Sequence, residues 1–575
     1  AAMSMALADA GGTALIIIPR LLGKMKTAEE RVTEQVQAVM DGNFSTERME
    51  ALKQEMLMDA ERGMETIDKR SDLMIDAFAK GHTWQDVMGK LERIRRLTKD
   101  DVMAAARKYY GVHHITLRKK YGTPDKETLK QPGYKPISPK NLDGKSEMAR
   151  QLEQMPVQHT AIRTVDFDKD IVTRPISDHV TLYYKENPVN DIFTFTLRYK
   201  DGTLHSPKLK VLAPYLGALG TDSLKKQQLE SAWQRIGTTM EVEEAGDQTF
   251  AISLTGPDRQ FAAALQLLAH FLRSAKGDEE ALDEAKDADK VTRKGIGKQK
   301  DNVLSPALQR VLYGQQSTYL TQLNKKEIKA LKSDELLTLF RNLQQYDCDL
   351  FYCGRQPVQS VAILSQQTLP LAQCQRPQTD TFRPLQQYAE PTIYFYHVPK
   401  SRQSYVVSYD AIRPLPTFEE RAKLSLWSEY FGGGMSSVLF QHVREFRSLA
   451  YSTSGKRMTT SVAQHPQETL GYITATGTQA DKLPQAMATI DSLLRQMPMK
   501  MENLEAARQT VLNDLQNTYP TFRTIGRYVA NQRMAGYTSN SATTMAQLIP
   551  GITAQEVELL LEQPECTDRK GYRDR

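Results

Sequence analysis

A long internal repeat limits what this chain can fold into more than any other feature of its sequence. Three segments place a hydroxyl residue before acidic residues and an apolar run, which is the pattern of a helix N-cap, and the hydroxyl residues are Thr98, Ser333 and Thr553. Ser333 follows Thr98 by 235 residues, and Thr553 follows Ser333 by 220. The sequence therefore predicts three equivalent helices that begin at these positions.

A second helix recurs at almost the same spacing. Its three copies lie at residues 49–53, 282–286 and 504–508, with the sequences MEALK, LDEAK and LEAAR. The offsets are 233 and 222 residues, and the two sets of offsets agree within two residues. Capping motifs alone are common, but two independent sets with the same offsets indicate duplication.

A strand and a helix are predicted ahead of each of these helices, because a segment rich in β-branched and aromatic residues precedes one with apolar spacing near 3.6. These pairs lie at residues 13–18 and 28–40, 249–254 and 260–272, and 469–475 and 483–494. The later copies also begin with a strand pair or its remnant and a helix, at residues 180–197 and 208–219, and 392–409 and 419–431. The predicted fold class is α+β, with tandem homologous domains in which an antiparallel sheet packs against helices.

The repeat also predicts the domain boundaries. Residues 1–122 form the back half of one copy, residues 166–380 a second copy and residues 381–575 a third. Residues 123–165 are assigned to a surface linker, because residues 123–155 contain four prolines among many Lys and Asp residues. A closing strand is expected at residues 115–117 and 350–352. The matching place at residues 567–571 reads TDRKG, so the third copy is expected to be incomplete.

Composition excludes several classes of protein. A net charge of +6 over 575 residues leaves no basic footprint for nucleic acid. The four cysteines show no C-x-x-C spacing and are interpreted as plain thiols. The dense apolar run of the opening segment, residues 15–18, is interpreted as a buried strand, and nothing in the chain approaches the roughly 18 to 20 apolar residues that cross a bilayer.

The sequence offers no local catalytic or metal-binding motif. None of the ten histidines forms the His-x-x-x-His pair that would place two zinc ligands on one helix face. The adjacent pair His113 and His114 leads into a predicted strand, where neighbours point to opposite faces. Gly-x-Ser-x-Gly and a Cys with a plausible His partner are absent as well. We therefore expect no catalytic residue and no metal ligand in this chain.

The triplet Gly432, Gly433 and Gly434 can be interpreted in two ways. A glycine-rich loop that opens a helix can bind phosphate, but this one lacks the Lys-Ser/Thr of a P-loop and the spacing of a dinucleotide motif. In the structural interpretation, the glycines allow a sharp turn, and Ser436 or Ser437 caps a helix at residues 438–446. We favour the structural interpretation.

The segment 431–452, FGGGMSSVLFQHVREFRSLAYS, resembles the signature stretch of the last domain of insulinase and pitrilysin peptidases. An arginine followed seven residues later by a tyrosine, here Arg444 and Tyr451, is part of that resemblance. The family has four homologous α+β domains in two halves that a linker joins and that close around a peptide. The resemblance implies that residues 1–122 belong to the second domain, residues 166–380 are the noncatalytic third domain and residues 381–575 are the substrate-binding fourth domain.

The resemblance further implies that Arg444 and Tyr451 bind the peptide substrate. It places the catalytic zinc in a first domain that this chain does not contain. The helices at the zinc-helix position, residues 212–221 and 424–430, have no histidine, and Glu429 alone cannot bind zinc. The expected partners are a peptide and an N-terminal half of the same protein or a homologous subunit. Family habit favours the bacterial cell envelope or periplasm.

Two alternatives remain at this stage. Some relatives that have lost the zinc motif act as noncatalytic partners or scaffold subunits. An unrelated repeat scaffold would require the match at Arg444 and Tyr451 to be coincidental. Whether the protein is an enzyme therefore depends on a zinc motif outside this sequence.

Overall fold

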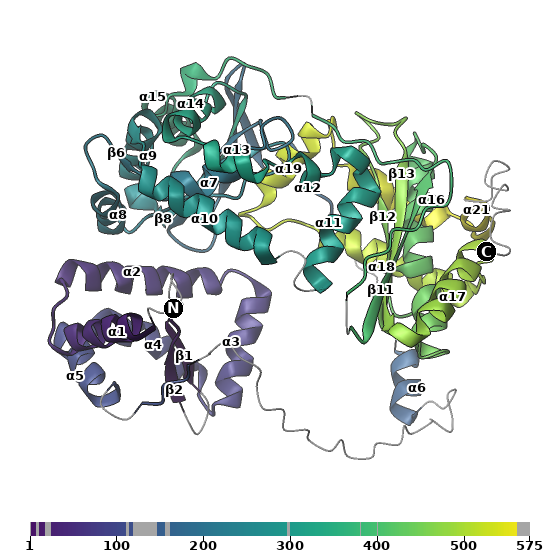
Figure 1. Cartoon of the computed structure of the whole chain (residues 1–575), viewed down its shortest axis with the longest axis horizontal. Helices are drawn as coiled ribbons and strands as arrows, with labels where there is room; N and C mark the ends of the chain where they lie inside the picture. Colours follow the sequence, from purple (N-terminus) through teal and green to yellow (C-terminus); the bar gives the residue numbers. More distant parts are fainter. Residues whose placement is uncertain are drawn as a thin grey trace. The chain divides into compact units, whose positions relative to one another are not determined.

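The protein was examined as a computed structural model (Figure 1). The residues that it describes are 2–6, 11–17, 25–110, 114–118, 146–155, 161–295, 300–379, 381–398 and 401–560. They fall into two compact units. The first unit comprises residues 1–53 and 68–161, and the second comprises residues 54–67 and 162–575. Most of the predicted linker 123–165 and all of the tail 567–571 lie outside the described residues.

The first unit combines a small hairpin with helices. The hairpin pairs β1 (Ala2–Ala6) with β2 (Gly11–Leu15) in antiparallel register. The helices are α1 (Met25–Met40), α2 (Thr46–Gly63), which continues into the second unit, α3 (Ile67–Ala79), α4 (Trp84–Arg96), α5 (Lys99–Tyr109) and α6 (Glu147–Gln154). The predicted start of α5 is confirmed by a reciprocal cap. The Thr98 side chain accepts a hydrogen bond from the Asp101 backbone N–H, and the Asp101 carboxylate accepts one from the Thr98 backbone N–H.

Two strand predictions for the first unit are wrong. The apolar run at residues 15–18 was expected to be a buried strand, but β2 ends at Leu15, and both Leu15 and Ile16 are exposed. Residues 115–117 form no strand, and Ile115 and Leu117 are almost fully exposed. Within the described part of this unit, β1 and β2 pair with each other, and residues 115–117 pair with neither of them.

The second unit contains a six-stranded sheet of order β3-β4-β10-β5-β8-β7. Its strands are β3 (Val172–Ser177), β4 (Val180–Glu186), β5 (Ile192–Tyr199), β7 (Thr239–Val242), β8 (Phe250–Pro257) and β10 (Cys348–Gly354). All neighbours are antiparallel except β10 and β4, which are parallel. The closing strand expected at residues 350–352 is therefore confirmed as the buried strand β10.

Helices cover one face of this sheet and complete its core. The main ones are α7 (Leu209–Leu216), α8 (Lys226–Arg235), α9 (Phe261–Ser274), α10 (Glu279–Gly295), α13 (Lys325–Ala330), α14 (Ser333–Leu343) and α15 (Val358–Thr368). Phe193, Phe195 and Phe261 pack edge to face in the core, with ring centroids 5.1 and 5.6 Å apart. The predicted α+β layering is confirmed here.

The predicted cap at Ser333 is wrong in detail. Helix α14 begins at Ser333 itself, and the N-cap residue is Lys332, whose side chain makes no capping bond. The Ser333 hydroxyl is buried and hydrogen-bonds the hydroxyl of Tyr215 on α7. The Ser333 side chain, which the sequence predicts to cap α14, thus hydrogen-bonds a residue of another helix instead.

A three-stranded sheet of order β11-β13-β12 forms the second core of this unit. Its strands are β11 (Gln403–Ile412), β12 (Ala450–Met458) and β13 (Leu470–Gln479), and the surrounding helices are α16 (Phe418–Gly432), α17 (Leu483–Arg495), α18 (Met501–Asn517), α20 (Ser541–Leu548) and α21 (Ala554–Leu559). Trp427 of α16 stacks on Phe431 and meets the Tyr472 ring edge to face. The predicted cap at Thr553 is confirmed by its reciprocal hydrogen bonds with Glu556.

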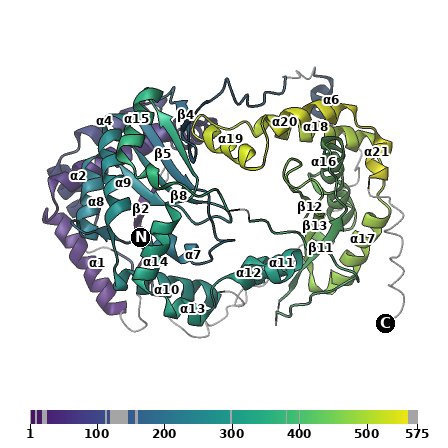
Figure 2. The same ribbon diagram turned by 90° about the horizontal axis from the view of Figure 1, so that it is seen from above.

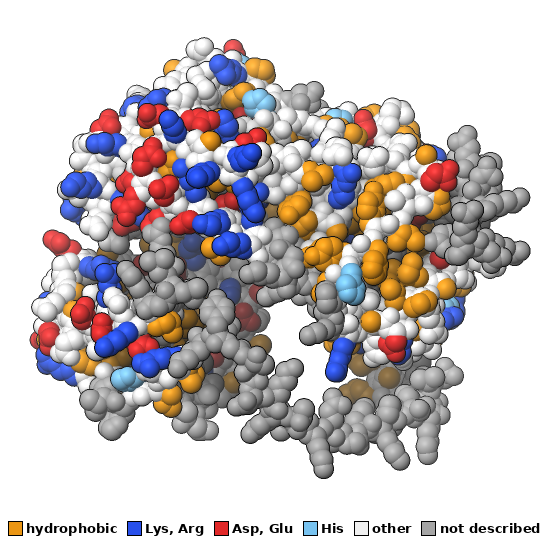
Figure 3. All heavy atoms as spheres, viewed as in Figure 1, with side chains coloured by type: hydrophobic (Ala, Val, Ile, Leu, Met, Phe, Trp, Pro, Cys, Tyr) orange, Lys and Arg blue, Asp and Glu red, His pale blue; other side chains and the backbone are white. Residues whose placement is uncertain are grey.

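Two strands were expected within residues 392–409, and among the described residues only the second of them, β11, is present. Residues 392–398 are outside any strand, and Ile393, Tyr394, Phe395 and Tyr396 are exposed. Apolar side chains gather over the three-stranded sheet on the face shown in Figure 3. In the six-stranded sheet β10 lies between β4 and β5, and no described strand takes that place beside β11. Residues 392–398 therefore have no described strand to pair with.

One helix connects the two cores. Helix α19 (Ile525–Met534) follows α18 but packs against β4 and β10 of the six-stranded sheet. It lies on the face of that sheet opposite the one that α9 and α15 cover (Figure 2). Its Ile525, Val529 and Ala530 form a separate buried cluster with Tyr183 and Phe351 of that sheet. Among the described residues, no helix is both long enough and apolar enough to span a bilayer.

Candidate functional site

The segment singled out by its sequence runs from the end of α16 to the start of β12. Helix α16 begins with a reciprocal cap between Thr417 and Glu420 and ends at Gly432, beside strand β12. A Cβ on Gly432 would lie 2.6 Å from both the Gly455 nitrogen and the Tyr472 hydroxyl oxygen. Gly432 is therefore needed for the close approach of α16 to β12.

The other two glycines correct the sequence interpretation. A Cβ on Gly433 would collide with the Glu429 carboxyl, and one on Gly434 would lie 3.4 Å from it. None of the three has a positive φ angle. Of the three, only Gly432 is thus required for close packing, because the Glu429 carboxyl can move away from a Cβ at 433 and 3.4 Å is an ordinary contact distance, and no glycine of the triplet forms a left-handed turn.

The helix after the glycines is an unusual one. Ser437 Oγ accepts a hydrogen bond from the Phe440 N–H, which confirms Ser437 as the capping residue. The predicted α-helix at 438–446 is instead mostly the π-helix η4 (Phe440–Glu445). A π-helix inserts an extra residue into a turn and recurs at functional sites. The insertion changes the direction of every side chain after it.

Two further backbone irregularities lie between Arg444 and Tyr451. Ser448 has a φ of 48°, a conformation that costs a non-glycine residue of order 1–3 kcal/mol. Its N–H donates to the Arg444 carbonyl at 2.9 Å. The pairing of β12 with β13 then shifts between Ala450 and Ser452, so Tyr451 is the extra residue of a β-bulge. Bulges redirect side chains, and this one turns Tyr451 outward.

These irregularities bring Arg444 and Tyr451 together. The Arg444 guanidinium lies 5.0 Å from the centre of the Tyr451 ring and 4.6 Å from that of Phe440. Its Nε lies 3.4 Å from a Glu445 carboxylate oxygen, and the side chain is 36% exposed. Tyr451 is 84% exposed, so its hydroxyl faces solvent. The pair is accessible, and the aromatic rings restrict where the guanidinium can point.

This arrangement can bind a peptide backbone but cannot cut one by itself. A guanidinium is always charged and carries five N–H donors, and a phenol adds one O–H donor. Such donors can hold a carbonyl oxygen and stabilise negative charge that develops on it. Both groups act here as hydrogen-bond donors, so what the pair itself supplies is binding.

A small hollow lies beside the pair and was not predicted. It holds about 200 Å³ and is lined by residues of α16, η4 and α18 and by the connections between them, among them Gln441, His442, Lys500 and Asn503. Burial lowers the pKa of His442, and the charges of Arg447 and Lys500 lower it further. Only the tertiary fold shows this hollow, because Lys500 and Asn503 follow His442 by about sixty residues.

The helices at the zinc-helix position carry no metal site. Helix α7 buries Leu212, Ala213, Tyr215 and Leu216 in the core of the six-stranded sheet. On α16, Glu429 is half-buried beside Gly433. Within the described part of the chain, no group of three His, Cys, Asp or Glu residues could hold a metal ion. Cys348, Cys353 and Cys374 are buried free thiols, as expected, and Cys566 lies outside the described residues.

Glu429 gives a testable pH dependence of stability. Burial raises its pKa above the usual range, the negative charge of Asp514 raises it further, and Arg457 opposes the shift. Since the folded-state pKa is the higher one, ionisation of Glu429 destabilises the fold as pH rises above the unfolded value. Glu429→Gln is therefore expected to raise the urea midpoint at pH 7 and to change it little at pH 4. An equal change at both pH values would contradict this assignment.

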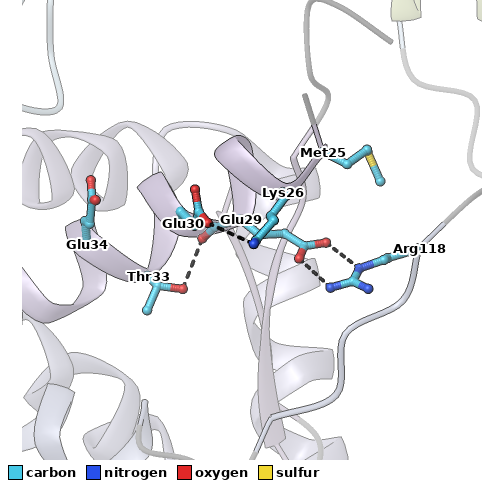
Figure 4. Close-up of a pocket in the computed structure, with 7 residues that line it drawn as sticks. All are labelled: Met25, Lys26, Glu29, Glu30, Thr33, Glu34 and Arg118. Carbon is cyan, nitrogen blue, oxygen red and sulfur yellow. Dashed lines mark hydrogen bonds and ion pairs between the residues drawn. The ribbon is translucent and has the colours of Figure 1, made fainter. Parts of the chain in front are cut away.

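A larger hollow is of a different kind. It holds about 840 Å³ along α1 of the first unit, and its lining side chains are shown in Figure 4. Arg118 donates from Nε and Nη2 to the two carboxylate oxygens of Glu29 at 2.7 and 2.6 Å, and this lowers the pKa of Glu29. Lys26 and Glu30 lie 3.9 Å apart. This hollow is a solvated charged face with paired groups rather than a reaction site.

Comparison with known proteins agrees with the predicted resemblance. Residues 331–511, which include the Arg444 and Tyr451 segment, match a family model described as the peptidase M16 inactive domain. The predicted resemblance to the C-terminal portion of insulinase and pitrilysin peptidases is thereby confirmed. No curated protein matches the chain.

Solved structures show the same fold at low sequence identity. A peptidase M16 inactive domain from Pseudomonas fluorescens is 17% identical, with a TM-score of 0.52 over 68% of this chain and 93% of that one. The periplasmic protease PqqL from Escherichia coli is 12% identical, with a TM-score of 0.54 over 93% of this chain. The ferredoxin protease FusC, solved with Arabidopsis ferredoxin, is 12% identical, with a TM-score of 0.50 over 94% of this chain. The chain covers 62% of PqqL and 62% of FusC.

Proposed function

We propose that this chain is the substrate-binding C-terminal half of a zinc-dependent metalloendopeptidase that degrades or processes peptides. The observation that carries the proposal is the exposed pair of Arg444 and Tyr451, which a π-helix, a strained Ser448 and a β-bulge hold within 5.0 Å of each other. Strained backbone persists where the surrounding structure enforces it and clusters at functional sites. In this proposal the pair holds a peptide carbonyl near the scissile bond.

The zinc belongs to an N-terminal half in this proposal. The metal would polarise the scissile carbonyl and activate water. This chain would contribute binding and orientation, through residues 166–380 as a noncatalytic third domain and residues 381–575 as the fourth. The likeness to the periplasmic protease PqqL supports a periplasmic location.

Reconstitution tests the proposal. The zinc-bearing half is produced separately, mixed with this chain, and assayed on an internally quenched unfolded peptide. Cleavage is expected only in the mixture and is expected to disappear when a chelator removes zinc. Chelator-sensitive cleavage by this chain alone would contradict the proposal, because the zinc site is assigned elsewhere.

A noncatalytic partner subunit is the alternative. The match to a family model named for an inactive domain favours it. In that case the chain binds the unfolded peptide, but mixing with the zinc-bearing half leaves the rate of cleavage unchanged.

A further inference from the structure

Three helices occupy equivalent positions in the repeat, and each is followed by a glycine with a positive φ angle. Gly81, Gly314 and Gly536 have φ angles of 67°, 54° and 82° and follow α3, α11 (Lys300–Tyr313) and α19. They are 233 and 222 residues apart, the same offsets as the repeated helices before them. Left-handed glycines commonly end helices, so each glycine marks the same helix end.

Two of the three helices cover a sheet of a neighbouring core. On α19, Val529 and Ala530 are 0% and 1% exposed against Tyr183 and Phe351. The Arg533 guanidinium lies 5.7 Å from the centre of the Tyr183 ring. Apolar residues of α19 thus cover part of the outer face of the six-stranded sheet, and its Arg527 and Arg533 lie over the Phe351 and Tyr183 rings.

Helix α11 makes the reciprocal contact. It leaves the core of the six-stranded sheet and packs beside β11 of the three-stranded sheet. Tyr388 donates a hydrogen bond from its hydroxyl to the Val311 carbonyl at 2.8 Å, and the Leu312 carbonyl accepts one from the Gln386 N–H at 2.7 Å. Both α11 and α19 therefore pack against the sheet of the other core.

Helix α3 presents the same positions without such a cover. Counted back from the glycine, Met74, Ile75 and Phe78 correspond to Val529, Ala530 and Arg533. They are 61%, 66% and 89% exposed, and they lie on one helix face at the spacing i, i+1 and i+4. Ala77, on an adjacent face of the helix, is buried. The exposed apolar face of α3 is thus the counterpart of the two docked faces.

We propose that the face of α3 formed by Met74, Ile75 and Phe78 docks on the outer face of an antiparallel sheet in the zinc-bearing half. This inference rests on the proposed function, because that half would supply the homologous sheet. A second copy of this chain fits less well, since α19 already covers one of its sheets and α11 lies against the other. Exposed aliphatic and aromatic side chains in one patch mark a protein interface.

The test measures binding between this chain and the separately produced zinc-bearing half by sedimentation velocity. The variants Phe78→Asp and Met74→Asp are expected to weaken binding at least tenfold each, because a carboxylate would lose its water in the docked state. Both side chains are exposed, so circular dichroism should show an unchanged fold. Met501→Asp is the matched control, since Met501 is also exposed but lies on α18.

Each outcome supports or overturns the inference independently of catalysis. Weaker binding by the α3 variants alone supports it, even if the complex cleaves no peptide, which would overturn only the proposed function. Unchanged binding by both variants overturns it, even if mixing restores cleavage. Absence of binding by the wild-type chain overturns it as well. Self-association that Phe78→Asp abolishes would identify a second copy as the occupant and overturn the assignment to the zinc-bearing half.

Discussion

Replacing Arg444 by alanine is expected to lower kcat/KM for peptide cleavage by the reconstituted enzyme about 10²- to 10³-fold, the usual cost of losing one donor to a developing oxyanion. The guanidinium is held between the Phe440 and Tyr451 rings, so little side-chain freedom is lost when it meets the peptide. The measurement is initial rate against concentration of an internally quenched peptide, with the zinc content of the complex determined in parallel.

The division of the effect between kcat and KM identifies the role of Arg444. An equal fall in kcat and kcat/KM indicates a contact made in the transition state, and a rise in KM alone indicates uniform binding. Arg444→Lys keeps the charge but loses the planar fork and should recover only part of the rate. Arg495→Ala is the control, because Arg495 is also partly exposed and paired with one carboxylate, at 2.8 Å, but lies on α17. Equal rates for Arg444→Ala and this control would refute the assignment.

The repeat and the layering could be predicted from the sequence because they depend on local pattern. Helix caps such as those at Thr98 and Thr553 are contacts within four residues, and the helices around them are fixed by apolar periodicity. Ser333 has the same sequence pattern, but its hydroxyl hydrogen-bonds Tyr215, which is 118 residues away, and does not cap its helix. Local reasoning fails where a distant side chain competes.

The candidate site could be predicted only as a pair of residues. The resemblance indicates Arg444 and Tyr451, but periodicity predicts an ordinary α-helix and cannot show a π-helix, a positive φ at Ser448 or a bulge at Tyr451. These three features depend on how η4 and β12 pack against α16 and β13. The π-helix, the positive φ and the bulge bring the two side chains together. A spacing of seven residues does not by itself require that contact.

Docking of α19 on the six-stranded sheet also escaped prediction, and it surrounds a buried ion pair. The Arg198 Nη2 and Asp349 Oδ2 atoms are 2.6 Å apart, and Lys200 Nζ lies 3.2 Å from the other carboxylate oxygen. Arg198 Nη1 donates to the side chain of Asn531 on α19 at 2.6 Å. Because Asp349 is fully buried, the network joins β5, β10 and α19 away from water.

Replacing Asp349 by alanine is expected to lower the free energy of unfolding by about 3–5 kcal/mol, the usual cost of leaving one buried charge without its partner. That is a large part of the roughly 5–15 kcal/mol that stabilises a typical domain. The measurement is urea unfolding followed by circular dichroism, with hydrogen exchange of α19 as the local readout. Protection of the α19 amides should fall first, since Arg198 holds Asn531.

A matched control separates burial from charge. Glu335→Ala removes an ion pair with Lys208 whose side chains are 42% and 40% exposed, and it should cost at most about 1 kcal/mol. The double variant Arg198→Met with Asp349→Leu removes both fully buried charges and should recover much of the stability lost by Asp349→Ala, because the remaining Lys200 side chain is 19% exposed and its ammonium can reach water. Similar losses for Asp349→Ala and Glu335→Ala would refute the role assigned to the pair. If the double variant is the least stable of the three, the ion pair itself stabilises the docked α19, and desolvation of the two charges is the smaller effect.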